Sequence, residues 1–590
     1  MRDADMMSQS RTDESLRSEG DSMFRITHMR PALFLVTALL TLGVAASASA
    51  ATWPAGTHQV SLAVDRVEGA DRYATAVAVA RAGWPGWAGI DRVIIASGEP
   101  RSYADPLAAG SLCWAYDAPL MLVESDRVPS SVKSALAAIH SANGGVDVTI
   151  VGGPGAVSGA VVSELRSLIT SGTVEQPWTV GDRYTTAARV AARSAQVASE
   201  TSRTVPARAF IANGTDRFGF VDALALSAVS ARTGVPVLLV QPGEVPLSTA
   251  SALRSLPVGD VIVAGGTTAV SNTVYSRVGA TSRWGGSDRY ATSVAIARGA
   301  RTEGWLTGEM VGVAAAIPDA LTGSTYAAKM GGPLLYSEKA VLAPATAYYL
   351  AGMQGTVSSA VIFGGPNAVS TSQERELGGA PSAPLLVAPS DSSYVAKKAN
   401  VRVRTGVNTS EVKLYVGSTL IATRPATSYT VVDFGLVAVP ADGISLRVVA
   451  TNPDGKVTET SGKYRRLAYP AATSIVIDKS DFRIYLVQND VLVESYPIAI
   501  GRPGMETPTR LWKINSKYYT DPNGMYGPRK MRLYAQAGST WVYTAYGIHG
   551  TNEPWVIGTK ASHGCIRLYN EDILDLFPQV RLGTLVLTRE

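Results

Sequence analysis

Three stretches of the 590-residue sequence are nearly the same: Gly69-Ala-Asp-Arg-Tyr-Ala-Thr75, Gly181-Asp-Arg-Tyr-Thr-Thr186 and Gly286-Ser-Asp-Arg-Tyr-Ala-Thr292. Their Asp residues stand at positions 71, 182 and 288, which gives spacings of 111 and 106 residues. Each stretch opens an Ala-rich segment of helical character, so its Asp is placed to cap the N-terminus of that helix. A repeat of this length predicts three copies of one structural unit in the first two-thirds of the chain.

The same order of signals follows in each unit. A short β-branched run leads to an Asp before an Ala/Leu-rich helix, and two more strands follow, the last of which ends in Gly-Gly. Strands that alternate with helices predict α/β units with a mainly parallel sheet. The Asp residues are Asp105, Asp222 and Asp319, and the Gly-Gly pairs begin at Gly152, Gly265 and Gly364.

The Gly-Gly turns raise the possibility of a nucleotide site, because glycines let backbone N–H groups approach phosphate. Their spacing matches neither a dinucleotide fingerprint nor a Lys-containing phosphate loop, and a turn repeated three times is typical of a structural element. We therefore expect no cofactor.

These units, with Asp-Arg-Tyr and a later Gly-Gly-x-x-Ala-Val-Ser, resemble the cell-wall-binding repeat of Gram-positive surface proteins. The resemblance implies three α/β repeats in a pseudo-threefold assembly, at residues 64–170, 171–278 and 279–378, that bind anionic wall polymers noncovalently. It does not assign the binding residues. A competing interpretation, three enzymatic domains, lacks a repeated His/Cys or acid-pair cluster, because His58 and His140 have no counterparts in the other units.

Residues 1–50 are predicted to form a secretory signal region. Basic residues precede the apolar run 31–46, and the small residues Ala48-Ser49-Ala50 follow it where a signal peptidase would cut. Because a polar stretch precedes this run, Met23 or Met29 could be the start codon. A membrane anchor is the alternative, but the run is short for a bilayer span. We therefore expect secretion to the cell wall or surface of a Gram-positive-type bacterium, with no membrane span after signal cleavage.

Composition and net charge limit the classes of binding partner that can be expected. The chain is 46% hydrophobic and 17% charged, an ordinary globular profile, but it is too long for a single core. Its formal net charge of +5 is spread without a Lys or Arg block, so nucleic acid is not an expected partner. A diffuse attraction to anionic wall polymers remains compatible with it.

The cysteine count is unusual for an exported protein, because the chain has two cysteines in what are predicted to be different domains. A disulfide between them is therefore not expected. Cys113 lies in an apolar helical stretch, where a buried inert thiol is favoured. Cys565 requires another explanation.

The sequence character changes after the repeats. A Pro-, Ser- and Ala-rich stretch predicts a linker at residues 379–395. Short alternating strands with turns at Gly417-Ser418 and Asn452-Pro-Asp-Gly455 then predict a small immunoglobulin-like β-sandwich at residues 396–470 that serves as a spacer.

The C-terminal region, residues 474–590, begins with strand-like runs and is predicted to be a β-rich enzyme domain. It contains Gly547-Ile-His-Gly-Thr551 and Ala561-Ser-His-Gly-Cys-Ile-Arg-Leu568. A neighbouring imidazole can take the proton of a thiol and produce the attacking thiolate. Glycines beside His549 and Cys565 leave room for a peptide and free N–H groups for an oxyanion.

This pair of motifs resembles the L,D-transpeptidase (YkuD-type) catalytic domain over about residues 474–590. The resemblance implies that Cys565 is the nucleophile, that His549 is the acid/base, and that the Gly550 carbonyl orients the imidazole. It further implies that Ser562 and His563 shape the pocket, that Gly564 and Cys565 offer oxyanion N–H groups, and that Arg567 supports the substrate or the pocket. Arg510 departs from the family, which commonly has Gly there.

The activity implied is cross-linking of peptidoglycan from donor and acceptor stem peptides, third residue to third residue, through a cysteine acyl-enzyme. If water resolves the acyl-enzyme instead of an amine, the chain is an L,D-carboxypeptidase with the same residues. A third interpretation is a surface adhesin or scaffold that works through its repeats. Zinc bound by His549, His563 and Cys565 is a further alternative, but no fourth ligand is evident, so no metal is expected.

Overall fold

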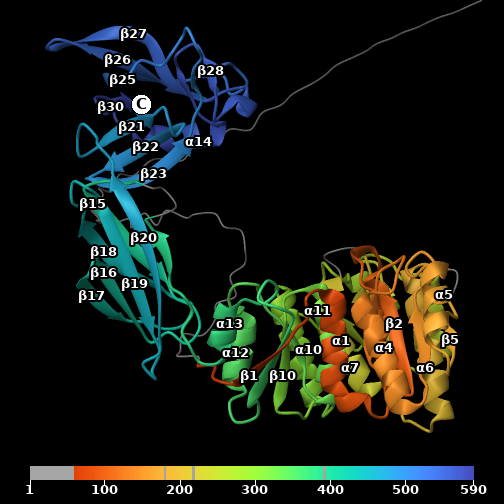
Figure 1. Ribbon diagram of the computed structural model, residues 1–590. Coiled ribbons are helices and arrows are strands. Elements are labelled where there is room, and N and C mark those ends of the chain that lie inside the picture. Colours follow the sequence, from red (N-terminus) through yellow and green to blue (C-terminus); the bar gives the residue numbers. More distant parts are fainter. Residues whose placement is uncertain (1–58, 179–180, 216–219, 390–393) are drawn as a thin grey trace, which may run out of the picture. The chain divides into compact units, whose positions relative to one another are not determined.

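The computed structural model describes residues 59–178, 181–215, 220–389 and 394–590. The predicted signal region and His58 lie outside these residues. Strands alternate with helices up to about residue 377, and strands dominate from there on (Figure 1). Among the described residues, no helix is both long and apolar enough to cross a membrane.

The repeats have three parallel four-stranded sheets with the strand orders β3-β2-β4-β5, β7-β6-β8-β9 and β11-β10-β12-β1. Their strands are β1 (Ala63–Val67), β2 (Arg92–Ser97), β3 (Leu120–Val123), β4 (Asp147–Val151), β5 (Val174–Glu175), β6 (Arg208–Asn213), β7 (Val237–Val240), β8 (Asp260–Ala264), β9 (Ser282–Trp284), β10 (Met310–Ala314), β11 (Leu334–Tyr336) and β12 (Ser359–Phe363).

The helices of the repeats follow the predicted order, and Asp71, Asp182 and Asp288 cap α1, α6 and α10 through side-chain hydrogen bonds to backbone N–H groups. These caps confirm the role inferred from the repeated motif. The helices are α1 (Arg72–Gly83), α2 (Ala104–Ala108), α3 (Gly110–Tyr116), α4 (Ser130–Asn143), α5 (Gly159–Leu168), α6 (Arg183–Glu200), α7 (Phe220–Thr233), α8 (Leu247–Ser255), α9 (Asn272–Arg277), α10 (Arg289–Thr302), α11 (Ile317–Lys329), α12 (Pro344–Gly352) and α13 (Thr371–Leu377).

The strand before each Asp-Arg-Tyr motif pairs with the sheet of a different unit. β5 and β9 extend the sheets of the first and second repeats, and β1 pairs in parallel with β12 of the third, Ala63 opposite Ser359. The predicted boundaries assign each of these strands to the repeat whose Asp-Arg-Tyr motif it precedes. In the structure each strand belongs to the sheet of another repeat, so the sheets cross the predicted boundaries. The exchange links each repeat to the next through main-chain hydrogen bonds.

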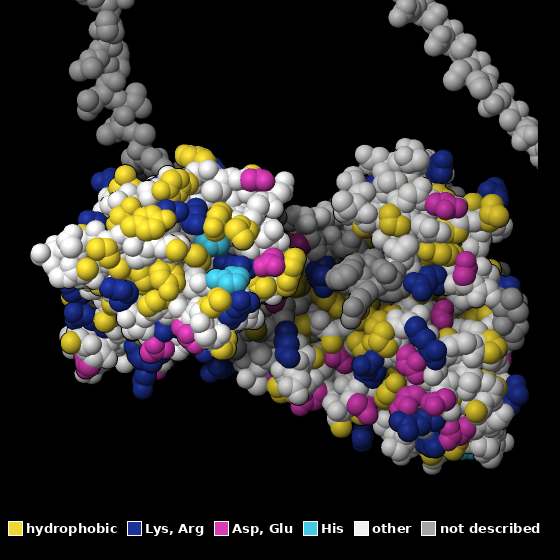
Figure 2. All heavy atoms as spheres, turned by 90° about the horizontal axis from the view of Figure 1, so that it is seen from above, with side chains coloured by type: hydrophobic (Ala, Val, Ile, Leu, Met, Phe, Trp, Pro, Cys, Tyr) yellow, Lys and Arg dark blue, Asp and Glu magenta, His cyan; other side chains and the backbone are white. Residues whose placement is uncertain are grey.

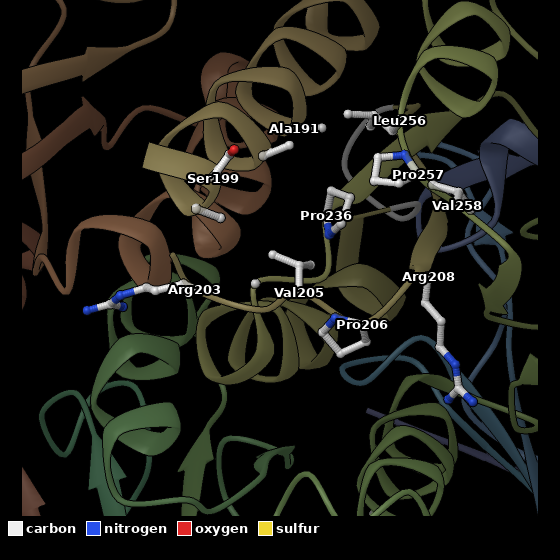
Figure 3. Close-up of a pocket in the computed structure, with 13 residues that line it drawn as sticks. Ala191, Ser199, Arg203, Val205, Pro206, Arg208, Pro236, Leu256, Pro257 and Val258 are labelled. Carbon is white, nitrogen blue, oxygen red and sulfur yellow. The ribbon is translucent and has the colours of Figure 1, made fainter. Parts of the chain in front are cut away.

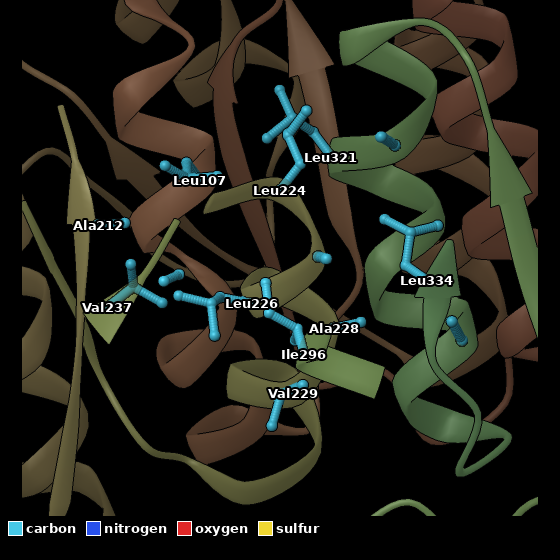
Figure 4. Packing of buried hydrophobic residues seen from close by; sticks show 14 of the residues in the cluster. Leu107, Ala212, Leu224, Leu226, Ala228, Val229, Val237, Ile296, Leu321 and Leu334 are labelled. Atoms are coloured by element: carbon cyan, nitrogen blue, oxygen red, sulfur yellow. The ribbon is translucent and has the colours of Figure 1, made fainter. Parts of the chain in front are cut away.

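One hydrophobic cluster contains residues of all three repeats, besides the clusters within individual repeats. Leu107, Leu224 and Leu321 stand two residues after the corresponding Asp of each unit and are fully buried in the same cluster. Figure 4 shows Leu224 and Leu321 side by side, with Leu107 close to them. Helices α7 and α11, and helices α3 and α7, pack directly against each other. Burial of these apolar side chains stabilises the contact between the repeats.

The segment 379–395, predicted to be a linker, contains the strands β13 (Leu385–Ala388) and β14 (Tyr394–Val395). β13 pairs antiparallel with β15, so this part of the segment belongs to a sheet. Composition did not reveal it, because the strand is short and its pairing partner lies farther along the chain.

Residues 394–466 form strands with the predicted turns, since Gly417 lies between β16 and β17 and residues 452–456 join β19 to β20. One sheet has the order β14-β20-β19-β16-β17, and β15 pairs with β13 and β18. Apolar residues of both sets of strands meet in one core. The strands are β15 (Lys398–Arg404), β16 (Glu411–Val416), β17 (Thr419–Pro425), β18 (Val431–Ala438), β19 (Ile444–Thr451) and β20 (Val457–Arg466).

The C-terminal domain is β-rich, as predicted. Its main sheet has the order β23-β22-β21-β30-β25-β26-β27-β29, and β24 pairs with β28. The core beneath the sheet includes Trp512, Ile548 and Ile566 together with residues of α14. The elements are β21 (Ser474–Asp478), β22 (Arg483–Gln488), β23 (Val491–Pro497), β24 (Ile500–Gly501), β25 (Leu511–Tyr519), β26 (Arg529–Ala537), β27 (Thr540–His549), β28 (Lys560–Ser562), β29 (Ile566–Arg567), α14 (Asn570–Gln579) and β30 (Leu585–Arg589).

Candidate active site

Cys565 lies in a tight turn between β28 and β29, and Ser562 holds this turn together. The buried Ser562 hydroxyl donates to the Cys565 carbonyl at 2.5 Å and accepts from the Gly564 N–H at 3.0 Å. Cys565 itself is partly exposed, with its sulfur 3.8 Å from the Ala545 carbonyl oxygen. The turn therefore presents a thiol on a backbone fixed from within.

Gly564 is required by both the shape and the packing of this turn. Its φ of +102° is in the region that favours glycine, and a Cβ there would collide with the Tyr546 ring. Its carbonyl accepts from the Thr507 hydroxyl at 2.9 Å, and that hydroxyl accepts from the Gly501 N–H at 2.9 Å. Thr507 thus ties the cysteine turn to the end of β24.

His549 is the last residue of β27, which runs parallel to β29 with Ile548 opposite Ile566 and His549 opposite Arg567. This register brings the cysteine turn alongside the end of β27. The imidazole is 2% exposed, and the Tyr526 ring meets it edge-on, with centroids 4.9 Å apart. His549 at the end of β27 and the cysteine turn that leads into β29 are therefore neighbours in the sheet.

The Gly550 carbonyl oxygen is 2.5 Å from Nδ1 of His549. A carbonyl oxygen only accepts, so Nδ1 carries the proton and Nε2 of the neutral ring is left as an acceptor. Gly550 has no space for a side chain, because a Cβ would collide with Oδ1 of Asn570. That amide oxygen accepts from the Thr551 N–H at 2.9 Å, which fixes the Gly550–Thr551 peptide and with it the carbonyl that faces the imidazole.

Burial lowers the pKa of His549 to about 4. The hydrogen bond to Gly550 opposes this shift, and the positive charges of Lys530 and Arg567 add to it. The imidazole is therefore neutral at the pH of most media, which is the form that can accept a proton from a thiol.

The other predicted pocket residues occupy different surroundings. His563 is exposed, with Nε2 3.0 Å from an Arg502 guanidinium nitrogen. Arg567 is mostly buried and forms an ion pair with Glu553. Figure 2 shows histidine side chains at the surface beside basic and hydrophobic side chains. Among the described residues, no group of three His, Cys, Asp or Glu side chains is arranged to hold a metal ion.

One of the two N–H groups expected to stabilise an oxyanion, that of Gly564, is already used in another hydrogen bond. The Gly564 N–H already donates to Ser562, so it is engaged within the turn. For the described residues, no hydrogen bond is found for the Cys565 N–H. Of the two expected donors, the Cys565 N–H is the one that is free in this structure.

Four residues of the site were given no role from the sequence: Thr507, Tyr526, Lys530 and Asn570. Thr507 and Asn570 support the two glycine turns by hydrogen bonds, and Tyr526 and Lys530 lie beside the imidazole. The Thr507-Pro-Thr509 and Tyr526-Gly-Pro-Arg529 motifs were the available signals.

A cavity of about 200 Å³ in the second repeat lies apart from this chemistry. It is lined by small apolar residues, among them Ala191, Pro236 and Val258 (Figure 3). Arg208 on its wall is already paired with Asp260 and Glu303. Ser199 is on its wall, but the described residues that line the cavity include no His, Asp, Glu or Cys that could activate this hydroxyl. The candidate active site therefore remains that of Cys565 and His549.

The two cysteines should react very differently with iodoacetamide. Cys113 is 4% exposed, and burial raises its pKa to about 12, so it holds little thiolate. Cys565 is partly exposed, so we expect one alkylation, at Cys565, in the native chain and a second only after denaturation. Intact mass followed by peptide mapping measures this, and fast labelling of native Cys113 would contradict the described burial.

The fold and the site define a multidomain protein in which α/β repeats precede a β-rich domain with a cysteine–histidine site. Residues 472–587 match the L,D-transpeptidase catalytic domain family (YkuD). Residues 66–162, 181–275 and 283–374 match cell wall binding domain 2. The chain therefore carries a YkuD-type L,D-transpeptidase catalytic domain preceded by three cell-wall-binding repeats.

Individual relatives match one part or the other. N-acetylmuramoyl-L-alanine amidase LytC of Bacillus subtilis is 30% identical over 314 residues, which are 53% of this chain and 58% of that protein. The putative L,D-transpeptidase YkuD of Bacillus licheniformis is 36% identical over 117 residues, 20% of this chain and 64% of that protein. The chain thus spans less than two-thirds of the length of either relative.

Among solved structures, Cwp6 from Clostridium difficile is 25% identical with a TM-score of 0.45, over 56% of this chain and 50% of its own. The catalytic domain of the E. faecium L,D-transpeptidase is 20% identical with a TM-score of 0.17, over 21% of this chain and all of its own.

Proposed function

We propose that the protein is a secreted, wall-bound L,D-transpeptidase that cross-links peptidoglycan through an acyl-enzyme on Cys565. The observation that supports this most is the hydrogen bond between Nδ1 of His549 and the Gly550 carbonyl. It leaves Nε2 of a neutral imidazole as a base on the strand beside the cysteine turn.

In the first half-reaction, Nε2 of His549 takes the thiol proton and the sulfur of Cys565 attacks the carbonyl carbon of the third stem residue. The Cys565 N–H stabilises the developing oxyanion. The bond to the terminal D-residue then breaks, and the imidazolium gives its proton to the leaving amine. A thioester remains on Cys565.

In the second half-reaction, the side-chain amine of a diamino acid on another stem attacks the thioester carbonyl. His549 takes a proton from this amine and returns it to the leaving sulfur, which regenerates the thiol. The product joins the third residues of two stems. No cofactor or metal takes part in the proposed sequence.

The supporting parts are assigned by the same proposal. The three repeats form a pseudo-threefold assembly that binds anionic wall polymers, the strands at 396–470 form an immunoglobulin-like spacer, and residues 1–50 direct secretion of a Gram-positive-type surface protein. In this proposal Ser562 and Gly564 shape the cysteine turn, and His563 and Arg567 shape the pocket. The Gly550 carbonyl orients the imidazole.

The second candidate is an L,D-carboxypeptidase, in which water resolves the thioester. The partial exposure of Cys565 favours this alternative, because water can reach a thiol at the surface. The step uses the same histidine as a base and releases the stem as a tripeptide.

The products made by the full chain from a muropeptide with a tetrapeptide stem test the proposal. Mass spectrometry should find dimers joined third residue to third residue, with one terminal residue released per bond. Release of the terminal residue without formation of dimers would show an L,D-carboxypeptidase instead of a transpeptidase. No turnover, with wall binding retained, would replace the proposal by a scaffold.

A further inference from the structure

Lys530 is a buried cation next to the candidate active site. It lies in β26 and is 6% exposed, with its ammonium nitrogen 3.4 Å from the centre of the Tyr526 ring. Within the described part of the chain, no hydrogen bond or ion pair to this ammonium is found. Lys517 of the same domain differs, because its ammonium donates to the carbonyls of Phe577 and Val580.

The position of Lys530 relates it directly to His549. The two residues are opposite each other in the antiparallel pairing of β26 with β27, so their side chains share a face of the sheet. The Tyr526 ring connects them, since its face meets the ammonium and its plane is at 83° to the imidazole. Gly547 leaves room for the lysine stem, because a Cβ there would lie 3.2 Å from Cε of Lys530.

The charges around the imidazole are not balanced. Two cations, Lys530 and Arg567, act on His549. Arg567 has a carboxylate partner in Glu553, whereas Lys530 has an aromatic face. An aromatic face contributes about 0.5–2 kcal/mol to an ammonium and carries no net negative charge, so the positive charge stays uncompensated on the side of Lys530. An anion at this place would therefore be bound favourably.

We propose that Lys530, supported by Tyr526, forms a subsite for a carboxylate of the donor stem peptide. This inference rests on the proposed function. The stem offers two sources of the same chemistry near the scissile bond, the carboxylate of the terminal D-residue and the side-chain carboxylate of a diamino acid at the third position. The subsite selects donors in which that carboxylate is free rather than amidated.

Occupation of the subsite also acts on the base. A carboxylate beside Lys530 offsets the positive charge that disfavours the imidazolium form of His549. The substrate thereby assists the proton transfer from the thiol to Nε2. This coupling predicts that loss of the carboxylate lowers kcat as well as raising KM.

Three donors test the proposal in the full chain: the free acid, the C-terminal amide and the amide of the third-residue side chain. For wild type, we expect kcat/KM to fall about 10- to 100-fold for one of the two amides, the size expected for a charge-assisted hydrogen bond. The amide that fails identifies which carboxylate is bound. Lys530→Met should turn over all three donors at similar rates, and Lys530→Arg should restore part of the preference.

Lys560→Met is the matched control, because Lys560 is an exposed lysine of β28 in the same domain. Lys560→Met should keep the wild-type preference for the free-acid donor. If Lys560→Met loses this preference, the effect is a general one of charge and the subsite is overturned. Retention of the preference in Lys530→Met would overturn it as well. Wild-type turnover without any preference contradicts the subsite alone, whereas absence of turnover on every donor contradicts the proposed function too. Binding of the three donors to Cys565→Ala, with and without Lys530→Met, gives a readout that is independent of turnover.

Discussion

Replacement of Cys565 by Ala should abolish dimer formation and release of the terminal residue together, a fall of about 10⁴-fold or more in kcat. Both reactions pass through the thioester, and no other partly exposed thiol exists in the described chain. The measurement is quantitative mass spectrometry of muropeptide products, with intact mass of the protein to detect the acyl adduct. The adduct should be seen with wild type and not with the variant.

The matched control is Cys113→Ala. Cys113 is buried among apolar side chains of the first and second repeats, outside the catalytic domain. This variant should keep wild-type activity and lose on the order of 1 kcal/mol of stability from the smaller side chain. Retained activity in Cys565→Ala, or loss of activity in Cys113→Ala alone, would contradict the assignment of the nucleophile.

The repeat organisation was predictable because it depends on local signals. Asp71, Asp182 and Asp288 open their helices by capping, and a cap is readable from a few consecutive residues. The exchange of strands β1, β5 and β9 between units was not predictable in the same way. β1 pairs with a strand about 300 residues away, and a short strand does not indicate its partner from its own sequence.

The residues of the candidate site also divide into those that the sequence identifies and those that only the fold brings together. Cys565, His549 and Gly550 were identified because a thiol, an imidazole and a glycine have distinctive chemistry within two short motifs. Thr507 and Asn570 were not, because a Thr and an Asn are common residues whose roles depend on the loops that fold against them. The hydrogen bond from the Gly564 N–H to Ser562 could not be predicted from the sequence either, since it depends on the conformation of the turn.

Lys530 illustrates why burial cannot be read from residue type. Lysine is usually exposed, and this one follows Arg529 at the start of β26, where two basic residues suggest a solvated strand end. The structure instead encloses its side chain between Gly547 and Tyr526. Gly547 lies on the neighbouring strand β27, and Tyr526 lies in the turn before β26. The enclosure of Lys530 therefore depends on how the turn and the two strands pack together.

His549→Gln should lower kcat/KM by about 10²- to 10⁴-fold, because the amide can keep a hydrogen bond but cannot accept the thiol proton. In wild type, the base must be neutral, and burial places its pKa at about 4. Activity limited by this group should therefore persist as pH falls through 6.5 and decline near pH 4. A decline centred at pH 6.5 would contradict the buried, uncharged imidazole.

The same pKa has a consequence for stability, with a definite sign. Below pH 6.5 the unfolded chain takes up a proton on His549 that the folded chain takes up only near pH 4. The stability that the group contributes is therefore complete above pH 6.5 and is lost as pH falls toward 4, by about 3 kcal/mol. Denaturant unfolding followed by Trp fluorescence between pH 4 and 7 should show a shallower loss for His549→Gln than for wild type. Since the other acids and bases of the fold are common to both chains, the difference between the two curves isolates the imidazole, and equal slopes would mean that His549 is exposed and charged in solution.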